Sequence, residues 1–193
     1  RFPNIYQTCL KFGFDMVKNS IPVVPAAHYT CGGVLVDLNG QTNIRHLFAS
    51  GEVCYSGLHG ANRLGGNSLS DLITFGKRSG EYSAKAAAEM DGWEEISQSE
   101  IDEVVAETLA PFSREGGENP ATVVNELRKM MQEKVGIIRT KDLLTEALDD
   151  LNAFATRGKA TSPGGSRIYN PGWHQALEIN AMIDISRMCA MAA

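Results

Sequence analysis

Residues 25–71 read PAAHYTCGGVLVDLNGQTNIRHLFASGEVCYSGLHGANRLGGNSLSD, and the organisation of the whole chain follows from this stretch. The alternating run at 33–37 and the apolar run at 47–51 predict two short strands. Asn39-Gly40 lies between them and predicts a turn, because this dipeptide adopts positive φ readily. The stretch is therefore expected to begin as a small β unit.

A glycine-rich loop at 56–67, SGLHGANRLGGN, follows the second predicted strand. Its glycines indicate backbone that turns sharply or approaches another group closely. Ser68 with Asp71 three residues later predicts a capping box, and the helix that starts there is expected to run to about Met90. One face of this helix is expected to pack against another layer, and its members are Leu69, Leu72, Ile73, Gly76, Gly80, Ala84 and Ala87.

The flanking segments are expected to be mostly helical. Residues 1–20 roughly follow the helical period and predict a helix with a short tail. The segment 21–27, IPVVPAA, contains two prolines and predicts an extended crossing, which indicates a boundary between structural units.

From residue 91 onward the apolar periodicity predicts four helices, whose apolar stripes are expected to form the core of a helical bundle. Asn119 and Pro120 predict the start of the second helix, and Thr140 that of the third. The third is expected to end at Arg157-Gly158, and the fourth to begin at Trp173. The expected core includes Ile101, Val104, Val105, Leu109, Phe112, Val123, Val124, Leu127, Met131, Leu143, Leu144, Ala147, Leu148, Leu151 and Phe154.

Composition bounds the class of protein. The chain has 193 residues, 43% of them hydrophobic, which is ordinary for a globular protein of one domain or one and a half. The net charge of −5 and the lack of a basic stripe argue against a nucleic-acid partner. No apolar run approaches the roughly 18 residues that a membrane span requires. The four cysteines lack metal-ligand spacing, so no metal site is expected. They predict reduced thiols in a cytosolic, or cytoplasmic, protein.

The glycine-rich loop and the helix start at Ser68 together predict a site for negative charge. Unpaired N–H groups and the positive end of the helix dipole would suit a phosphate, a carboxylate or the N1–C2=O edge of a reduced flavin. The loop is neither a Walker motif nor a GxGxxG fingerprint. The alternative is a glycine-rich crossover that only packs tightly.

Three side chains in this stretch are candidate ligand groups. Arg63 lies among glycines, where its guanidinium suits bidentate capture of a carboxylate; the alternative is an ordinary surface arginine. His28 is a candidate hydrogen-bond donor or acid–base group, or else a structural histidine. Glu52 is a candidate acceptor for hydroxyl or N–H groups. The remaining histidines, His46, His59 and His174, show no metal-ligand spacing and are expected to be structural.

Three motifs in this order, HYTCGGVLVD, LFASGEV and GLHGANRLGGNSLSDL, resemble the flavoprotein subunit of succinate dehydrogenase and fumarate reductase. L-aspartate oxidase belongs to the same superfamily. The tail IYNPGWHQALEINAMIDIS resembles the C-terminal helical domain of the succinate dehydrogenase group, so the resemblance covers nearly the whole chain.

The resemblance implies an α+β fragment: the C-terminal part of a Rossmann-like FAD-binding domain, followed by an α-helical bundle domain. Residues 1–20 would end the capping domain, 21–90 would complete the FAD-binding domain, and 91–193 would form the helical domain. The cofactor would be FAD. His28 and Arg63 would hold the carboxylates of a C4 dicarboxylate. Glu52, Asn67, Ser68 and Leu69 would contact the cofactor.

The implied function is the interconversion of succinate and fumarate by hydride transfer to or from flavin N5. Electrons would pass to an iron–sulfur subunit and a quinone, with membrane anchor subunits holding the complex at the inner face of the cell membrane. The resemblance leaves L-aspartate oxidase open as an alternative. A non-catalytic piece that only docks a partner is a second alternative.

The family's dinucleotide-binding GxGxxG segment is absent from this sequence, and its proton-shuttling arginine would lie upstream of Arg1. No catalytic residue is therefore predicted here. We expect the chain to be an internal fragment that neither binds FAD tightly nor turns over by itself.

Overall fold

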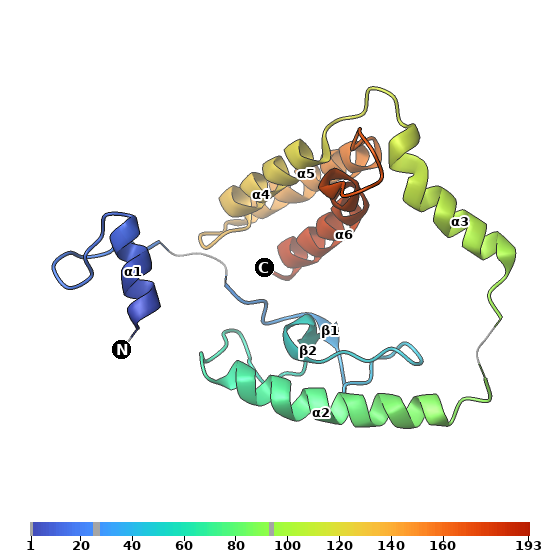
Figure 1. Cartoon of the computed structure of the whole chain (residues 1–193), viewed down its shortest axis with the longest axis horizontal. Coiled ribbons are helices and arrows are strands. Elements are labelled where there is room, and N and C mark those ends of the chain that lie inside the picture. Colours follow the sequence, from blue (N-terminus) through green and yellow to red (C-terminus); the bar gives the residue numbers. More distant parts are fainter. Residues whose placement is uncertain (1, 25–27, 93–94) are drawn as a thin grey trace.

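The structure is a computed structural model that describes residues 2–24, 28–92 and 95–193. Figure 1 shows a short N-terminal helix, a small β unit beside a long helix, a connecting helix, and the C-terminal helices packed together. The prediction of an α+β fragment with a helical C-terminal region is confirmed. The domain boundaries proposed at 20/21 and 90/91 stay predictions.

The core lies in the three C-terminal helices α4 (Pro120–Lys134), α5 (Lys141–Lys159) and α6 (Pro171–Ala192). Each turns an apolar stripe toward the other two, as the periodicity predicts. The buried cluster consists of Val123, Val124, Leu127, Met130, Ala147, Leu151, Phe154, Ile179, Ile183 and Ala190.

Local capping residues fix where these helices begin. The Asn119 side chain accepts a hydrogen bond from Ala121 N, and Pro120 occupies the first turn, as predicted. Thr140 caps α5 by accepting from Leu143 N, also as predicted. Asn170 caps α6, so that helix begins at Pro171, two residues before the predicted start.

The prediction that the first of these four helices joins the bundle core is wrong. Helix α3 (Gln98–Leu109) has no buried residue along its 12 described positions, and Val104 is 62% exposed. A 3₁₀ turn, η2 (Ala110–Ser113), continues it toward α6. There Trp173 Nε1 donates a hydrogen bond to Thr108 O at 2.8 Å, which ties the end of α3 to the start of α6.

The two-stranded unit precedes the helices. Strands β1 (Val34–Leu35) and β2 (Cys54–Tyr55) pair in parallel, with Val34 opposite Cys54. The strand predicted at 47–51 is wrong: Phe48 forms only an isolated bridge with Gln41, and the 3₁₀ turn η1 (Gly51–Val53) follows. Gly51 has φ +80°, which ends any extended run at this point.

Helix α2 (Asn67–Ala88) packs against η1 and the hairpin-like segment before it. A Cβ on Gly40 would lie 2.7 Å from the Ser79 side chain, so the close approach of this turn requires glycine. The buried residues of α2 are Asp71 and Ser79, not the predicted apolar face, since Leu69 and Ile73 are 68% and 73% exposed.

The predicted capping box at Ser68 is also wrong. Helix α2 begins at Asn67 after Gly66, and no side chain caps its N terminus. The Asp71 carboxylate is 2% exposed and is directed to His59. The Asp71 carboxylate therefore pairs with His59, twelve residues earlier in the chain, and not with the start of α2 as the capping box predicts.

The helix predicted within residues 1–20 is α1 (Pro3–Lys11), and the tail after it is longer than predicted. Residues 21–24 have no regular secondary structure, and the rest of the predicted crossing, 25–27, lies outside the described residues. None of the helices in the described ranges is both long enough and apolar enough to cross a membrane.

Candidate functional site

Arg63 is the candidate ligand group within the glycine-rich loop. Its side chain is half-buried, and its Nη1 donates to Gly65 O at 3.0 Å. Its guanidinium carbon lies 4.3 Å from the centroid of the Tyr29 ring. Its Nε is buried and has no hydrogen-bond partner among the described residues. The guanidinium is thus held by two protein groups while a buried N–H remains available.

His28 is exposed and directly precedes Tyr29, the residue whose ring lies under Arg63. The structure therefore brings Arg63 to the segment that carries His28, although 34 residues separate them in the sequence. The predicted roles of His28 and Arg63 toward a substrate stay predictions.

Glu52 reaches the same segment from η1. Its Oε1 accepts a hydrogen bond from Thr30 N at 3.0 Å. The role predicted for Glu52 toward a cofactor stays a prediction, because this bond lies within the protein. One of its oxygens is engaged within the protein, and the bond fixes the position of the segment after His28.

The predicted cofactor residues Asn67, Ser68 and Leu69 form the first turn of α2. Asn67 and Leu69 are exposed, whereas Ser68 Oγ is buried without a partner among the residues the structure describes. The first turn contains no acidic residue and has no side-chain cap. Its backbone N–H groups and positive dipole are therefore uncompensated by side chains, which suits a negatively charged or hydrogen-bond-accepting group.

Sequence reasoning missed a buried ionisable pair beside these residues. His59 Nε2 lies 3.4 Å from Asp71 Oδ2, and the two side chains are 7% and 1% exposed. The His59 ring also meets the Tyr29 ring edge-on, with centroids 5.5 Å apart. No local spacing signals this pair, because it forms between the loop and the helix that follows.

The pair also affects its neighbour Cys54 on β2. Burial of the thiol raises its pKa, and the negative charge of Asp71 raises it further. Cys54 is thereby held as an inert, protonated thiol next to the buried carboxylate.

The buried side-chain atoms that have no partner are concentrated in one short stretch. In the ranges that the structure describes they belong to His59, Arg63, Ser68 and Asp71, all within thirteen residues. Native proteins satisfy nearly all buried polar groups, so such a concentration indicates a place where another molecule or segment completes the bonding.

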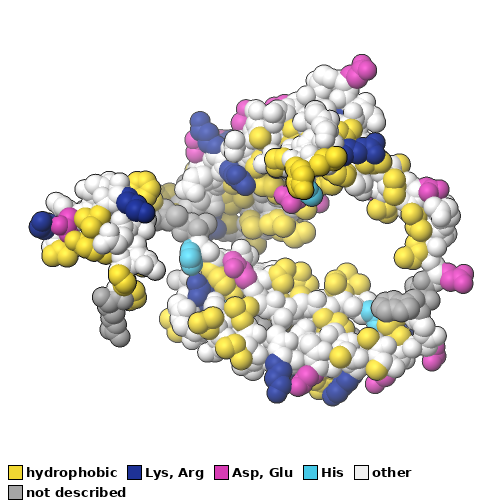
Figure 2. Space-filling view, in the orientation of Figure 1, with side chains coloured by type: hydrophobic (Ala, Val, Ile, Leu, Met, Phe, Trp, Pro, Cys, Tyr) yellow, Lys and Arg dark blue, Asp and Glu magenta, His cyan; other side chains and the backbone are white. Residues whose placement is uncertain are grey.

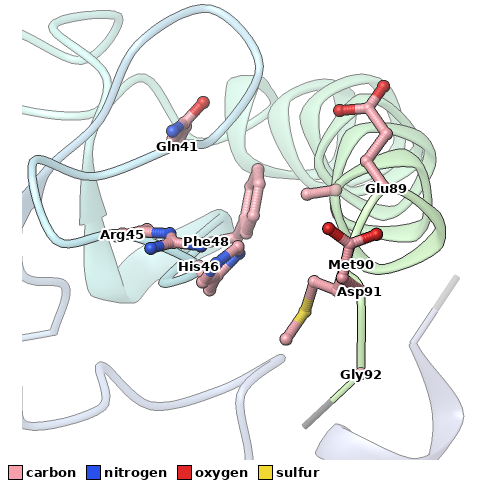
Figure 3. Close-up of a pocket in the computed structure, with 9 residues that line it drawn as sticks. Gln41, Arg45, His46, Phe48, Glu89, Met90, Asp91 and Gly92 are labelled. Atoms are coloured by element: carbon pink, nitrogen blue, oxygen red, sulfur yellow. The ribbon is translucent and has the colours of Figure 1, made fainter. Parts of the chain in front are cut away.

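A separate cavity of about 600 Å³ lies between the 41–48 segment and the C-terminal end of α2. Figure 3 shows Arg45 and His46 on one side of it and Glu89 and Asp91 on the other. It contains none of the predicted site residues, and the four unpartnered atoms lie outside it. No ligand role is assigned to it. The described residues also contain no cluster of three or more side chains that could hold a metal ion.

Comparisons with known proteins give the family. Residues 1–69 match the family model of an FAD binding domain, and residues 124–193 match that of the fumarate reductase flavoprotein C-terminus. The fumarate reductase flavoprotein subunit of Haemophilus influenzae is 37% identical over 186 residues, which cover 94% of this chain and 31% of that protein. The L-aspartate oxidase of Yersinia pestis is 40% identical over 161 residues, 79% of this chain and 27% of that protein.

Solved structures indicate the same family. A quinol–fumarate reductase structure from Escherichia coli matches all of this chain with a TM-score of 0.91 and 35% identity, and the match covers 33% of that chain. The chain thus spans about a third of the length of the proteins it matches. It belongs to the FAD-binding flavoprotein family of the fumarate reductase and succinate dehydrogenase subunits, to which L-aspartate oxidase is related.

Proposed function

We propose that this chain forms the dicarboxylate-binding and flavin-facing part of an oxidoreductase that interconverts succinate and fumarate. In this proposal Arg63 binds one carboxylate of the substrate and His28 binds the other. The observation that carries the proposal is Arg63 itself: a supported, half-buried guanidinium whose Nε is buried without a partner in the described residues. A carboxylate is the usual partner of such a group.

The residues present also fit FAD, the cofactor of this family. The uncapped first turn of α2 and the buried Ser68 hydroxyl would face its electron-rich edge, and Asn67 and Leu69 would border it. Glu52, held by Thr30 N, has a second carboxylate oxygen with which to accept from a cofactor hydroxyl. FAD, when bound, supplies the hydride chemistry.

This chain's own contribution is binding and orientation. Two cationic or hydrogen-bond-donating groups at opposite ends of a four-carbon dicarboxylate would fix the position of its two central carbons. The positive end of α2 would favour negative charge that develops near it during the reaction.

The partners belong to the same proposal. One similar solved structure is a quinol–fumarate reductase, which supports electron exchange with a quinone. An iron–sulfur subunit would carry the electrons between flavin and quinone. Membrane anchor subunits would then hold the protein at the inner face of the cell membrane.

The test uses the complete flavoprotein with its flavin bound. We expect Arg63→Ala to lower kcat/KM for succinate and fumarate by about 100-fold or more, because a charged carboxylate contact is lost. Arg63→Lys should be only partly active, since an ammonium cannot bind bidentately. Flavin content, read from absorbance, should be retained. The matched control is Arg45→Ala, which removes an arginine of the separate cavity and should leave kcat/KM unchanged.

Unchanged kinetics in Arg63→Ala would contradict the proposal and favour a piece that only docks a partner. The second candidate function is L-aspartate oxidation, which the 40% identity to an L-aspartate oxidase supports. The same preparations distinguish the two, because a fumarate reductase or succinate dehydrogenase should turn over succinate in strong preference to L-aspartate.

A further inference from the structure

The buried pair His59–Asp71 has no part in the function proposed above. Both side chains are almost fully removed from solvent, and the pair places a histidine ring next to the segment after His28. Removing a carboxylate and an imidazole from water is costly, and in some proteins a buried polar pair is retained because it specifies a position. The ring that His59 contacts here is that of Tyr29, with ring centroids 5.5 Å apart.

Tyr29 is contacted from two directions. The edge-on contact with His59 has an interplanar angle of 84°, and the Arg63 guanidinium carbon lies 4.3 Å from the Tyr29 ring centroid. The backbone next to Tyr29 is fixed as well, since Thr30 N donates to Glu52. The ring is thus supported on its sequence-adjacent side by Glu52 and in space by His59.

Arg63 needs such support because its own backbone provides little. It lies in a loop of turns between Gly60 and the start of α2, with no regular hydrogen-bond ladder. Its guanidinium is held by Gly65 O at one nitrogen and by the Tyr29 ring. Without the ring, the contact to Gly65 would leave the long side chain free to rotate about its remaining bonds.

We propose that Tyr29, held in place by the His59–Asp71 pair, is the positioning residue for Arg63. The inference rests on the proposed function, in which Arg63 binds a substrate carboxylate. Asp71 fixes the imidazole, the imidazole fixes the ring, and the ring orients the guanidinium so that Nε faces the ligand. Tyr29 also joins Arg63 to His28, its neighbour in sequence, and so sets the spacing between the two carboxylate-binding groups.

The first readout is kinetic and uses the complete, flavin-loaded protein. Tyr29→Leu removes the ring and should raise KM for succinate about tenfold with a smaller change in kcat, as expected for loss of a partly desolvated cation–π contact that supports binding. Tyr29→Phe keeps the ring and should stay within about twofold of the wild type. His59→Gln and Asp71→Asn should move KM in the same direction as Tyr29→Leu.

A double-mutant cycle separates positioning from a general structural effect. If Tyr29 acts through Arg63, the effect of Tyr29→Leu on kcat/KM should largely disappear in an Arg63→Ala background. Tyr82→Leu is the matched control. The Lys85 Nζ lies 4.8 Å from the Tyr82 ring centroid, so this change also removes a cation–π contact, at an exposed position of α2. It should leave KM unchanged.

The second readout does not depend on turnover. Phenylglyoxal modification of Arg63, followed by peptide mass spectrometry, should be faster in Tyr29→Leu than in the wild type, and equal to the wild type in Tyr29→Phe. Equal rates in all three proteins would overturn the positioning role. If Arg63→Ala leaves the kinetics intact, the proposed function fails, and the modification rates still decide whether Tyr29 positions Arg63.

Discussion

Arg157 on α5 binds the carboxylate of Glu118 through two nitrogens. Its Nε donates to Oε2 at 2.9 Å, and its Nη2 donates to Oε1. Arg157 Nη2 also lies 2.7 Å from Glu126 Oε2 on α4. One guanidinium therefore connects α5 both to α4 and to the loop before it. The hydrogen bonds from Arg157 lower the pKa of Glu118, whereas its partial burial opposes that shift.

This relationship predicts a pH-dependent stability. Because the folded-state pKa of Glu118 lies below the unfolded value of about 4.3, its contribution is present above that pH and is lost as the pH falls further. We expect Glu118→Gln to lower Tm by about 1–3 °C between pH 5 and 7, a small effect because a third of the side chain is exposed. The difference should shrink below about pH 4. Glu133→Gln, at an exposed 3.9 Å pair, is the control and should change Tm less at every pH.

Gly158 packs directly against α6. A Cβ at this position would lie 2.5 Å from Ile179 Cγ2, in the middle of the buried cluster. Gly158→Ala should therefore destabilise the protein by about 1–3 kcal/mol, although alanine is the better helix former. In an Ile179→Ala background the alanine at 158 should cost much less, because the opposing methyl group is gone. Additive losses in denaturant titrations of the four proteins would show that the clash is absent.

The Asn170 side chain caps the start of α6 and also holds the loop before it. Its Oδ1 accepts from Trp173 N, and its Nδ2 donates to Gly164 O and Ser166 O at 2.8 Å each. Asn170→Ala should cost about 1 kcal/mol or more, and Asn170→Asp should cost less because it keeps the cap. At Asn119 the cap uses Oδ1 on Ala121 N, so Asn119→Asp should be neutral or slightly stabilising. Thermal unfolding of these variants measures the contrast, and equal losses at the two positions would contradict it.

The cysteines should differ in reactivity. Cys54 is 7% exposed and its thiol pKa is raised, whereas Cys189 is exposed. Because the thiolate is the reactive species, iodoacetamide should label Cys189 rapidly and Cys54 only after unfolding. Asp71→Asn should quicken labelling of Cys54 modestly, since one cause of its raised pKa is removed. Labelling of native Cys54 at the rate of Cys189 would contradict the burial.

The C-terminal helices were predictable because their signals are local. Asn119 with Pro120, and Thr140, act within three residues, so the sequence identifies them without knowledge of the fold. The apolar stripe of α3 has the same period as those of α4 and α5, yet Val104 is exposed. Periodicity identifies a face but not the element that covers it, so the core assignment failed only there and on α2.

The candidate site was likewise predictable only where its signals are local in the sequence. The loop composition singles out Arg63, and the helix that follows is found within one residue of its start. The capping box failed because Asp71 pairs with His59, a tertiary partner that no spacing rule contains. Tyr29 was missed for a similar reason, since its importance comes from a ring placed between His59 and Arg63. The roles of His28, Glu52, Asn67, Ser68 and Leu69 stay predictions.

The hydrogen bond from Trp173 to Thr108 places an intrinsic fluorophore at the contact between α3 and α6. The indole is half-buried between the end of α3 and the first turn of α6, with the Phe112 ring 5.2 Å away. Indole emission moves to longer wavelength when the ring becomes hydrated. Separation of α3 from α6 should therefore shift the emission maximum of Trp173 to longer wavelength. The chain has two tryptophans, and Trp93→Phe would leave Trp173 as the single emitter. The contact between α3 and the helical bundle can thus be followed by intrinsic fluorescence, without any added dye.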